Sequence, residues 1–253
     1  MAASNMKNVV LITGASRGIG AATALAAADA GYHVGINYTR DERAAQDVAE
    51  QVRAKGVNAA IVKADVANEH EIVDMFDSVR SQLGAVTALV NNAGIILSQT
   101  SVLEMDAARI GRMLAVNVTG AFICAREAIR QMSSAEGGNG GAIVNVSSMA
   151  ARLGAPNEYV DYAASKGAID SFTIGLSKEV AEVGIRVNAV RPGIIYTDIH
   201  AAAGEPGRID RVAPSVPMRR GGQPHEVASA IMWLLSDEAS YVTGSFIDTA
   251  GGR

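Results

Sequence analysis

The stretch VVLITGASRGIG, residues 9–20, decides the fold, and the alanine-rich AATALAAADAG follows it at 21–31. A short aliphatic run predicts a buried strand, and the alanine-rich stretch predicts a helix. Between them, Gly14, Gly18 and Gly20 stand at G-x-x-x-G-x-G spacing. Such a turn lets backbone N–H groups approach a pyrophosphate at the positive end of the helix. The alternative is a turn that only joins packed elements, but the flanking strand and helix favour dinucleotide binding.

The rest of the chain continues this alternation of short apolar runs and helical patterns. Most runs are continuously apolar, as in strands that are buried on both faces. Amphipathic stretches at 41–56 and 68–84 each end in a glycine, as helices often do. We therefore expect an α/β Rossmann-like fold with a doubly wound, seven-stranded parallel sheet and helices on both faces. The expected strands are 9–13, 33–38, 58–63, 87–91, 141–147, 185–190 and 245–249.

The composition is that of a soluble globular protein. The 253 residues are 49% hydrophobic and 19% charged, with a net charge of −4. An acidic balance without a basic stripe argues against a nucleic-acid binder. The single cysteine, Cys124, cannot form an internal disulfide and is expected in the core, and the scattered histidines predict no metal site. The apolar run at 9–12 is too short for a signal peptide or a membrane span, which predicts a cytoplasmic protein.

Residues 1–253 are expected to form one domain, because no linker, repeat or low-complexity segment interrupts the alternation. The long irregular segment at 196–222 is rich in proline and glycine. Long irregular segments over a sheet are often lids. We therefore expect a substrate lid there.

The end of the second expected strand bears on the choice of cofactor. An acid about 20 residues past a glycine turn of this kind holds the free ribose 2′-hydroxyl of NAD. Here Asn37 stands at that position and Arg40 follows, while Arg17 lies in the turn itself. Two cations and no acid favour a 2′-phosphate and hence NADP(H). NAD(H) remains the alternative, because Asp41 and Glu42 are close by.

The stretch YVDYAASK, residues 159–166, offers a tyrosine and a lysine on one helical face. Tyr162 and Lys166 are four residues apart, whereas the residue four after Tyr159 is Ala163. A nearby ammonium stabilises a phenolate and lowers a tyrosine pKa, which would make Tyr162 a general acid or base nearer neutral pH. Alone, the spacing could be ordinary helix surface.

Further motifs occur in a fixed order around this pair. They are TGASRGIG, NNAG (91–94), LAVNVTGAF around Asn117, IVNVSS (143–148), YAASK and RPG (191–193). With them the sequence resembles the short-chain dehydrogenase/reductase family, including its 3-oxoacyl reductase and sugar dehydrogenase-like members. The resemblance implies a Rossmann fold, usually tetrameric, that transfers a hydride between a nicotinamide and a carbonyl or alcohol carbon.

The resemblance also implies residue roles. Tyr162 would be the catalytic acid/base, Lys166 would hold the nicotinamide ribose and tune it, Ser148 would polarise the substrate oxygen, and Asn117 would support a proton-relay water. Asp65 would contact the adenine, and Ile195 and Thr197 the carboxamide. The full set of expected cofactor contacts is Gly14, Ser16, Arg17, Gly18, Ile19, Gly20, Asn37, Tyr38, Arg40, Asp65, Val66, Asn91, Ala93, Gly94, Tyr162, Lys166, Pro192, Gly193, Ile195 and Thr197.

One spacing departs from the family pattern. The catalytic serine of the family precedes the tyrosine by thirteen positions, whereas Ser148 precedes Tyr162 by fourteen. Met149 stands at the usual spacing but cannot donate a hydrogen bond. The loop after it could absorb one residue, so Ser148 is the expected residue, with Ser147 as the alternative.

The sequence indicates where the substrate binds but does not identify it. Substrate contacts are expected from 95–100, 154–159 and the lid, where Arg152, Glu158, His200 and Arg208 either meet a polar substrate or are solvated. A cofactor-binding sensor or scaffold without turnover is the alternative function, because fold does not fix function.

The helix after Tyr162 bears on assembly, because it contains Gly167 and Gly175. Each costs about 1 kcal/mol against alanine, so a close neighbour is expected there, either the sheet or a second subunit. The family resemblance implies a homotetramer, with 244–252 as a further contact.

Overall fold

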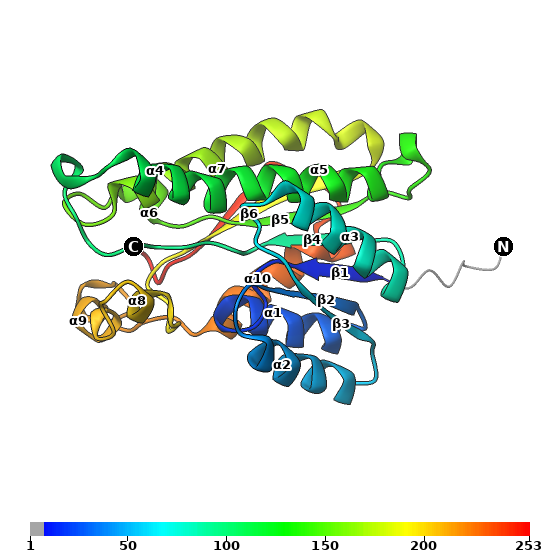
Figure 1. Cartoon of the computed structure of the whole chain (residues 1–253), viewed down its shortest axis with the longest axis horizontal. Helices are drawn as coiled ribbons and strands as arrows, with labels where there is room; N and C mark the ends of the chain where they lie inside the picture. Colours follow the sequence, from blue (N-terminus) through cyan, green and yellow to red (C-terminus); the bar gives the residue numbers. More distant parts are fainter. Residues whose placement is uncertain (1–7) are drawn as a thin grey trace.

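The computed structural model of the protein describes residues 8–253, so residues 1–7 of the expected domain lie outside the described part. Seven strands form one parallel sheet in the order β3-β2-β1-β4-β5-β6-β7 (Figure 1). The expected doubly wound fold is confirmed, and each strand matches its predicted range within two residues at either end. The strands are β1 Val9–Ile12, β2 His33–Tyr38, β3 Ala59–Lys63, β4 Ala88–Asn91, β5 Gly141–Val146, β6 Ile185–Pro192 and β7 Phe246–Thr249.

Helices cover both faces of the sheet (Figure 1). One face carries α1 Gly18–Asp29, α2 Glu42–Ala54 and α10 Pro224–Leu235. The other carries α3 Glu69–Leu83, α4 Ala107–Leu114, α5 Gly120–Met132 and α7 Val160–Glu179. The short helix α6 Ala150–Leu153 lies beside α7, whereas α8 Ile199–Ala202 and α9 Arg208–Val212 lie together on the opposite side at the same end of the sheet (Figure 1).

The sheet separates two cores. Side chains alternate along a strand, so Val10 and Ile12 of β1 join the core under α1, α2 and α10, while Val9 and Leu11 join the core under α3, α5 and α7. All four are fully buried, which explains the continuously apolar runs. Cys124 lies in the second core, where burial raises the pKa of its thiol to about 12.

The ends of α2 and α3 follow their sequence signals. The Asp41 carboxylate accepts a hydrogen bond from the Ala44 amide at 3.0 Å and caps α2. Both helices end at the predicted glycines, where Gly56 and Gly84 have φ values of 87° and 109°. These positive φ values favour glycine and stop the helices.

The buried face of α7 differs from the one that the sequence suggests. Apolar residues four apart, from Ala164 to Val180, mark a stripe, but Ala164 is exposed. The buried face instead includes Ser165, Lys166 and Thr173. These polar groups are buried because each makes hydrogen bonds within the protein, so hydrophobicity alone misses them, although Leu176 and Val180 of the stripe do lie in the second core.

The strand order places a crevice between β1 and β4, the point where the order reverses. In doubly wound sheets, ligands bind at the carboxyl ends of the strands at such a point. The glycine turn follows β1 and NNAG follows β4 at this edge of the sheet.

The continuous helical run Ala107–Met132 is long and apolar enough to cross a membrane by composition alone. It carries α4, a π-helical turn at Ala115–Thr119 and α5, and α5 packs on the second core. Only 28% of the most apolar 18-residue stretch of this run is buried, so the layer formed by α4 and α5 has an apolar outer face.

Candidate active site

The glycine turn is held against the end of β4 by side-chain hydrogen bonds. Asn92 Nδ2 donates to the carbonyls of Thr13 and Gly14 at 2.9 and 3.0 Å, and the Asn92 amide donates to Thr13 Oγ1 at 3.0 Å. A Cβ on Gly20 would lie 2.4 Å from the Gly14 carbonyl oxygen, so only glycine fits there. Asn92 is a structural residue of this turn that the sequence analysis missed. Its place in NNAG directly after a strand was the available signal.

Asn37 lies inside the protein at the end of β2. Its Oδ1 accepts a hydrogen bond from the Gly14 amide at 3.0 Å, and its Nδ2 donates to the Ala64 carbonyl at 3.0 Å. The side chain is 1% exposed. Since both ends of the amide are used internally, Asn37 shapes the glycine turn and does not present its side chain to a ribose.

Four charged residues lie near the end of β2, two acids that contact other groups of the protein and two exposed arginines. Asp41 caps α2, and Glu42 lies against the Tyr38 hydroxyl, where burial and then Glu42 raise the tyrosine pKa. Arg17 and Arg40 are exposed, and their side chains make no hydrogen bond or ion pair within residues 8–253. Of the four charged groups, only the cations are available to a ligand.

Asp65 lies at the carboxyl end of β3, with Val66 buried beside it. Its carboxylate accepts hydrogen bonds from the Ala67 amide and from Arg112, both at 3.0 Å. Burial raises the pKa of Asp65, but these two donors outweigh it and lower the pKa below its ordinary value. Asp65 is therefore ionised at neutral pH and is held in place by its ion pair with Arg112 of α4.

Ser148 and Tyr162 meet at the other side of the crevice. The Ser148 hydroxyl is within hydrogen-bond reach of the Tyr162 hydroxyl. Burial raises the pKa of Tyr162, while Ser148 lowers it. This direction is opposite to the lowering that the sequence analysis expects from Lys166. Tyr162 is consequently protonated at neutral pH.

Lys166 is turned away from the tyrosine hydroxyl, which explains the difference. Its Nζ donates to the Val146 carbonyl at 2.7 Å and lies 5.7 Å from the centre of the Tyr162 ring. Burial lowers the pKa of Lys166 to about 8, although Asp170 one turn along α7 opposes the shift. Lys166 is therefore mainly charged at neutral pH and loses its proton in mildly alkaline solution.

Asn117 lies in the π-helical turn Ala115–Thr119 and is 2% exposed. Its Oδ1 accepts from the Ile95 amide at 2.8 Å, and its Nδ2 donates to the Ile95 carbonyl at 3.0 Å and to Ser165 Oγ at 3.1 Å. Single π turns within helices are frequent at functional sites. A Cβ on Gly94 would lie 3.5 Å from both Asn117 Oδ1 and Lys166 Nζ, so both side chains border this glycine.

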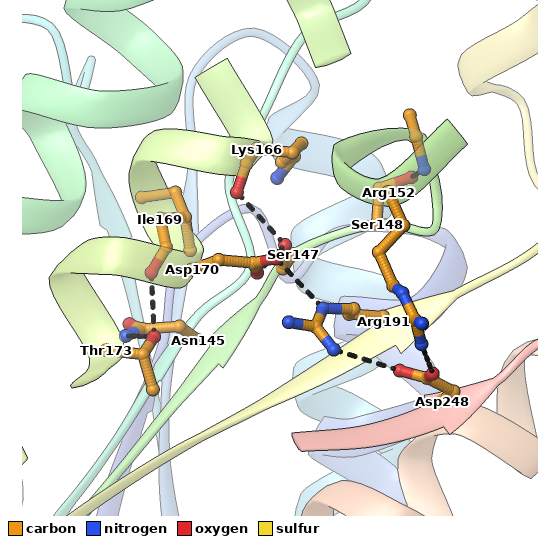
Figure 2. Close-up of polar contacts among 11 residues, drawn as sticks. Asn145, Ser147, Ser148, Arg152, Lys166, Ile169, Asp170, Thr173, Arg191 and Asp248 are labelled. Atoms are coloured by element: carbon orange, nitrogen blue, oxygen red, sulfur yellow. Dashed lines mark hydrogen bonds and ion pairs between the residues drawn. The ribbon is translucent and has the colours of Figure 1, made fainter. Parts of the chain in front are cut away.

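A chain of polar and charged side chains connects α7 to the ends of β5, β6 and β7 (Figure 2). Ser147 Oγ donates to Asp170 at 2.6 Å, and Arg191 Nε donates to the other Asp170 oxygen at 2.9 Å. Arg191 also reaches Asp248 at 3.4 Å, and Arg152 reaches it at 3.1 Å. Arg152, a predicted substrate contact, instead ties α6 to β7. Asp170 was missed because its partners are distant in sequence.

The remaining expected contacts lie around the same crevice. Asn91 Nδ2 donates to the Ala121 carbonyl at 3.1 Å and to Asn145 Oδ1 at 3.0 Å, so it ties β4 to α5 and β5. Thr197 Cγ2 would lie 3.2 Å from a Cβ on Gly18, which places the start of the lid against the glycine turn. At this edge, Ile19 lies in the first turn of α1 and Pro192 ends β6, and the loops contain Ser16, Ala93, Gly193 and Ile195.

The segment 196–222, the expected lid, contacts the residues that precede α7. Arg208 of α9 forms an ion pair with Glu158, and its guanidinium lies 4.9 Å from the centre of the Tyr159 ring. The Thr100 amide donates to the Glu158 carbonyl at 3.2 Å, so the loop at 95–100 adjoins the same place. The three expected substrate segments therefore meet.

The crevice fits a dinucleotide. No described side chain caps the N terminus of α1, where Arg17 is the N-cap residue, so the N–H groups of the first turn are left for a ligand. Gly14 and Gly18 have φ values of 63° and 58°, the left-handed backbone that glycine permits. Such a turn suits a pyrophosphate.

Sequence and structural comparisons agree with this geometry. Residues 14–253 match the family model described as "Enoyl-(Acyl carrier protein) reductase". The chain belongs to the short-chain dehydrogenase/reductase family, as the ordered motifs predict. It is therefore an NAD(P)-dependent oxidoreductase that acts on CH–OH or C=O groups.

Relatives are similar over nearly the whole chain. The chain is 58% identical over 245 residues to an Escherichia coli protein named as an uncharacterized oxidoreductase, YgfF, with 97% of this chain and 99% of that one covered. It is 36% identical over 247 residues to the 3-oxoacyl-acyl-carrier-protein reductase FabG of Staphylococcus epidermidis, covering 98% and 99% of the two chains.

Two solved structures share the fold. A short-chain dehydrogenase/reductase from Mycobacterium marinum has a TM-score of 0.90 at 34% identity, covering 97% of this chain and 94% of that one. The acetoin dehydrogenase YohF from Salmonella typhimurium has a TM-score of 0.86 at 35% identity, covering 98% and 97%.

Proposed function

We propose that the protein is an NADP(H)-dependent carbonyl reductase in which Tyr162 is the general acid. The observation that carries the proposal is the meeting of the Ser148 and Tyr162 hydroxyls across the crevice from the glycine turn, with Lys166 one helical turn further along α7. A sensor or scaffold that only binds cofactor would not require these three groups together.

The nicotinamide, when bound, supplies the hydride to the carbonyl carbon. Tyr162 donates its proton to the carbonyl oxygen, and the Ser148 hydroxyl stabilises the negative charge that develops on that oxygen. Burial keeps the pKa of Tyr162 raised, so the phenol is protonated at neutral pH and can act as the general acid in reduction. Lys166 and Asn117 border Gly94, on the path by which Tyr162 regains a proton through water.

Lys166 has a second role in this account. Its ammonium holds the ribose hydroxyls next to the nicotinamide, and its charge favours the phenolate that Tyr162 becomes. Asp170 keeps that ammonium protonated, since its charge raises the pKa that burial lowers. The Ser147–Asp170–Arg191 chain fixes Asp170 in place (Figure 2).

The preference for NADP(H) rests on the two exposed arginines. Arg17 and Arg40 are free to donate charge-assisted hydrogen bonds to a 2′-phosphate. Asp41 is occupied as a helix cap and Glu42 by Tyr38, so neither carboxylate is free for a 2′-hydroxyl. NAD(H) is expected to bind more weakly.

The substrate is a small carbonyl compound. One relative is named as a 3-oxoacyl-acyl-carrier-protein reductase, and one structural neighbour is named as an acetoin dehydrogenase. In both named substrates, a second carbon that bears oxygen lies close to the carbon that reacts. Residues 196–222 act as the lid of a single domain, and the protein works in the cytoplasm.

A homotetramer completes the proposal. Leu114, Phe122 and Ile174 on the α4–α5–α7 layer are 40%, 45% and 43% exposed. A Cβ on Gly167 or Gly175 would meet nothing within 4 Å, so the chain's own sheet is not the close neighbour that these glycines suggest. A second subunit on this apolar layer explains both observations.

The test is turnover by purified protein on ketones, sugars and 3-oxoacyl thioesters with NADPH and NADH. The proposal requires NADPH-dependent reduction of at least one class. Tight NADPH binding with no turnover on any class would favour the sensor or scaffold.

A further inference from the structure

The lid carries two buried polar atoms without a partner. Arg208 Nη1 and His200 Nδ1 are both buried and make no hydrogen bond within residues 8–253. The other end of Arg208 is fixed, because Nη2 donates to Glu158 and the guanidinium lies 4.9 Å from the Tyr159 ring centre. Arg208 is only 8% exposed. An unpartnered buried N–H group costs free energy, so a ligand oxygen is the natural partner for it.

These atoms lie next to the reacting group. Tyr159 and Ala203 belong to one small apolar cluster, and Tyr162 and Ile199 pack against the same cluster. Tyr159 therefore has Arg208 on one side and shares its packing with Tyr162 on the other. The cluster therefore connects Tyr162 to the part of 196–222 that carries His200 and Arg208.

The charges around Glu158 leave a positive balance. The hydrogen bond from Arg208 lowers the pKa of Glu158, and the charges of Arg211 and Arg253 lower it further, although burial opposes them. Glu158 is one-third exposed, so water screens its charge, whereas the Arg208 side chain is 9% exposed. Glu205 pairs with Arg211 and adds a second carboxylate, so Arg208, Arg211 and Arg253 exceed the two carboxylates by one positive charge.

His200 is an uncharged neighbour of the Arg208 guanidinium. Burial, and after it the charge of Arg208, lowers the pKa of His200. The imidazole is therefore neutral at neutral pH and does not repel the guanidinium. The unpartnered Nη1 of Arg208 is a charged donor that suits a carboxylate oxygen.

We propose that Arg208 binds a carboxylate of the substrate, so that the protein reduces oxo acids, with the carbonyl at Tyr162 and the carboxylate under the lid. This inference rests on the proposed carbonyl reductase function and names its substrate class.

The experiment compares oxo acids with their neutral ethyl esters. Pyruvate, acetoacetate and levulinate place the carboxylate at increasing distances from the carbonyl, and each is assayed with NADPH beside its ester. We expect at least one acid to be reduced with a kcat/KM about 10- to 100-fold above that of its ester, the range that hydrogen bonds to charged groups provide.

Variants assign the preference to Arg208. Arg208→Gln should remove the acid preference, because it should raise KM for the acid by a larger factor than any change in kcat/KM for the ester. Arg211→Gln is the matched control, since Arg211 lies on the same short helix with its side chain 56% exposed and pairs with Glu205. It should keep the preference. Glu158→Gln removes the competing carboxylate and should increase the preference.

Two results would overturn the inference while leaving carbonyl reduction intact. One is an ester reduced as well as its acid at every chain length. The other is an equal loss on acid and ester in Arg208→Gln. If neither the acids nor the esters nor any compound in the wider panel is reduced by a folded, NADPH-binding protein, the carbonyl reductase function fails together with this inference.

Discussion

Ser147 and Ser148 are adjacent at the end of β5, but their hydroxyls serve different partners. Ser147 Oγ donates to Asp170 at 2.6 Å and is 2% exposed, whereas the Ser148 hydroxyl reaches Tyr162. The one-residue longer spacing to Tyr162 is accommodated between α6 and α7, where Ala155 and Asn157 have φ values of 45° and 62°.

Substitution of the two serines by alanine should therefore have different effects on activity and stability. Ser148→Ala should lower kcat by about 10²-fold or more, because a donor to the developing negative charge is lost, while the melting temperature stays close to that of the parent. Ser147→Ala should destabilise the fold by about 1–3 kcal/mol, because it leaves buried Asp170 short of a donor. Steady-state kinetics and thermal unfolding measure both. The reverse pattern would assign the role to Ser147.

Cofactor choice should depend on Arg40. Arg40→Ala should raise KM for NADPH by about 10- to 100-fold, the contribution of a hydrogen bond to a charged group, and leave KM for NADH nearly unchanged. Arg43→Ala, which removes another exposed arginine near the start of α2, is the control and should change neither. Equal or better kinetics with NADH in the unmodified enzyme would contradict the NADP(H) preference.

Binding of NADPH should weaken in alkaline solution. Lys166 is charged below its pKa of about 8 and neutral above it, so its ribose contacts lose charge assistance as pH rises through that value. We expect the dissociation constant, measured by calorimetry, to rise about tenfold between neutral pH and pH about 9.5. Lys166→Met should bind more weakly and show no such rise. An unmodified protein whose affinity stays flat over this range would rule out the role of Lys166 charge.

Assembly should depend on the apolar layer of α4, α5 and α7. Ile174→Glu places a charge on that layer and should dissociate the homotetramer into smaller species at micromolar concentration, as light scattering would show. Asp47→Lys alters an exposed charge on α2 and should leave the tetramer intact. An unmodified protein that is monomeric under these conditions would refute the assembly.

The strands and the glycine turn were predictable because each depends on local patterning. Ser148 and Asn117 were named only through the family resemblance, and the roles of Asn117, Ser148, Tyr162 and Lys166 stay predictions. An apolar run, a glycine spacing and a tyrosine–lysine pair four residues apart are visible in a few residues of sequence. Gly56 and Gly84 stop their helices for the same local reason.

The rest depends on contacts between distant segments. Asn37 turns inward because the Gly14 amide and the Ala64 carbonyl lie on either side of it. The pKa of Tyr162 rises because burial outweighs Ser148, which spacing on a helix cannot reveal. Arg208 and Glu158, fifty residues apart, meet only when the lid folds over α7.

The central claim is tested most directly by kcat and NADPH affinity of Tyr162→Phe, with Tyr159→Phe as the matched variant. Tyr162→Phe removes the proton donor and little volume, so kcat should fall by about 10²–10⁴-fold while NADPH affinity is retained. Tyr159→Phe keeps the ring under Arg208 and should stay within a few-fold of the parent. A Tyr162→Phe protein that retains parental kcat, or a Tyr159→Phe protein that loses it instead, would contradict the account.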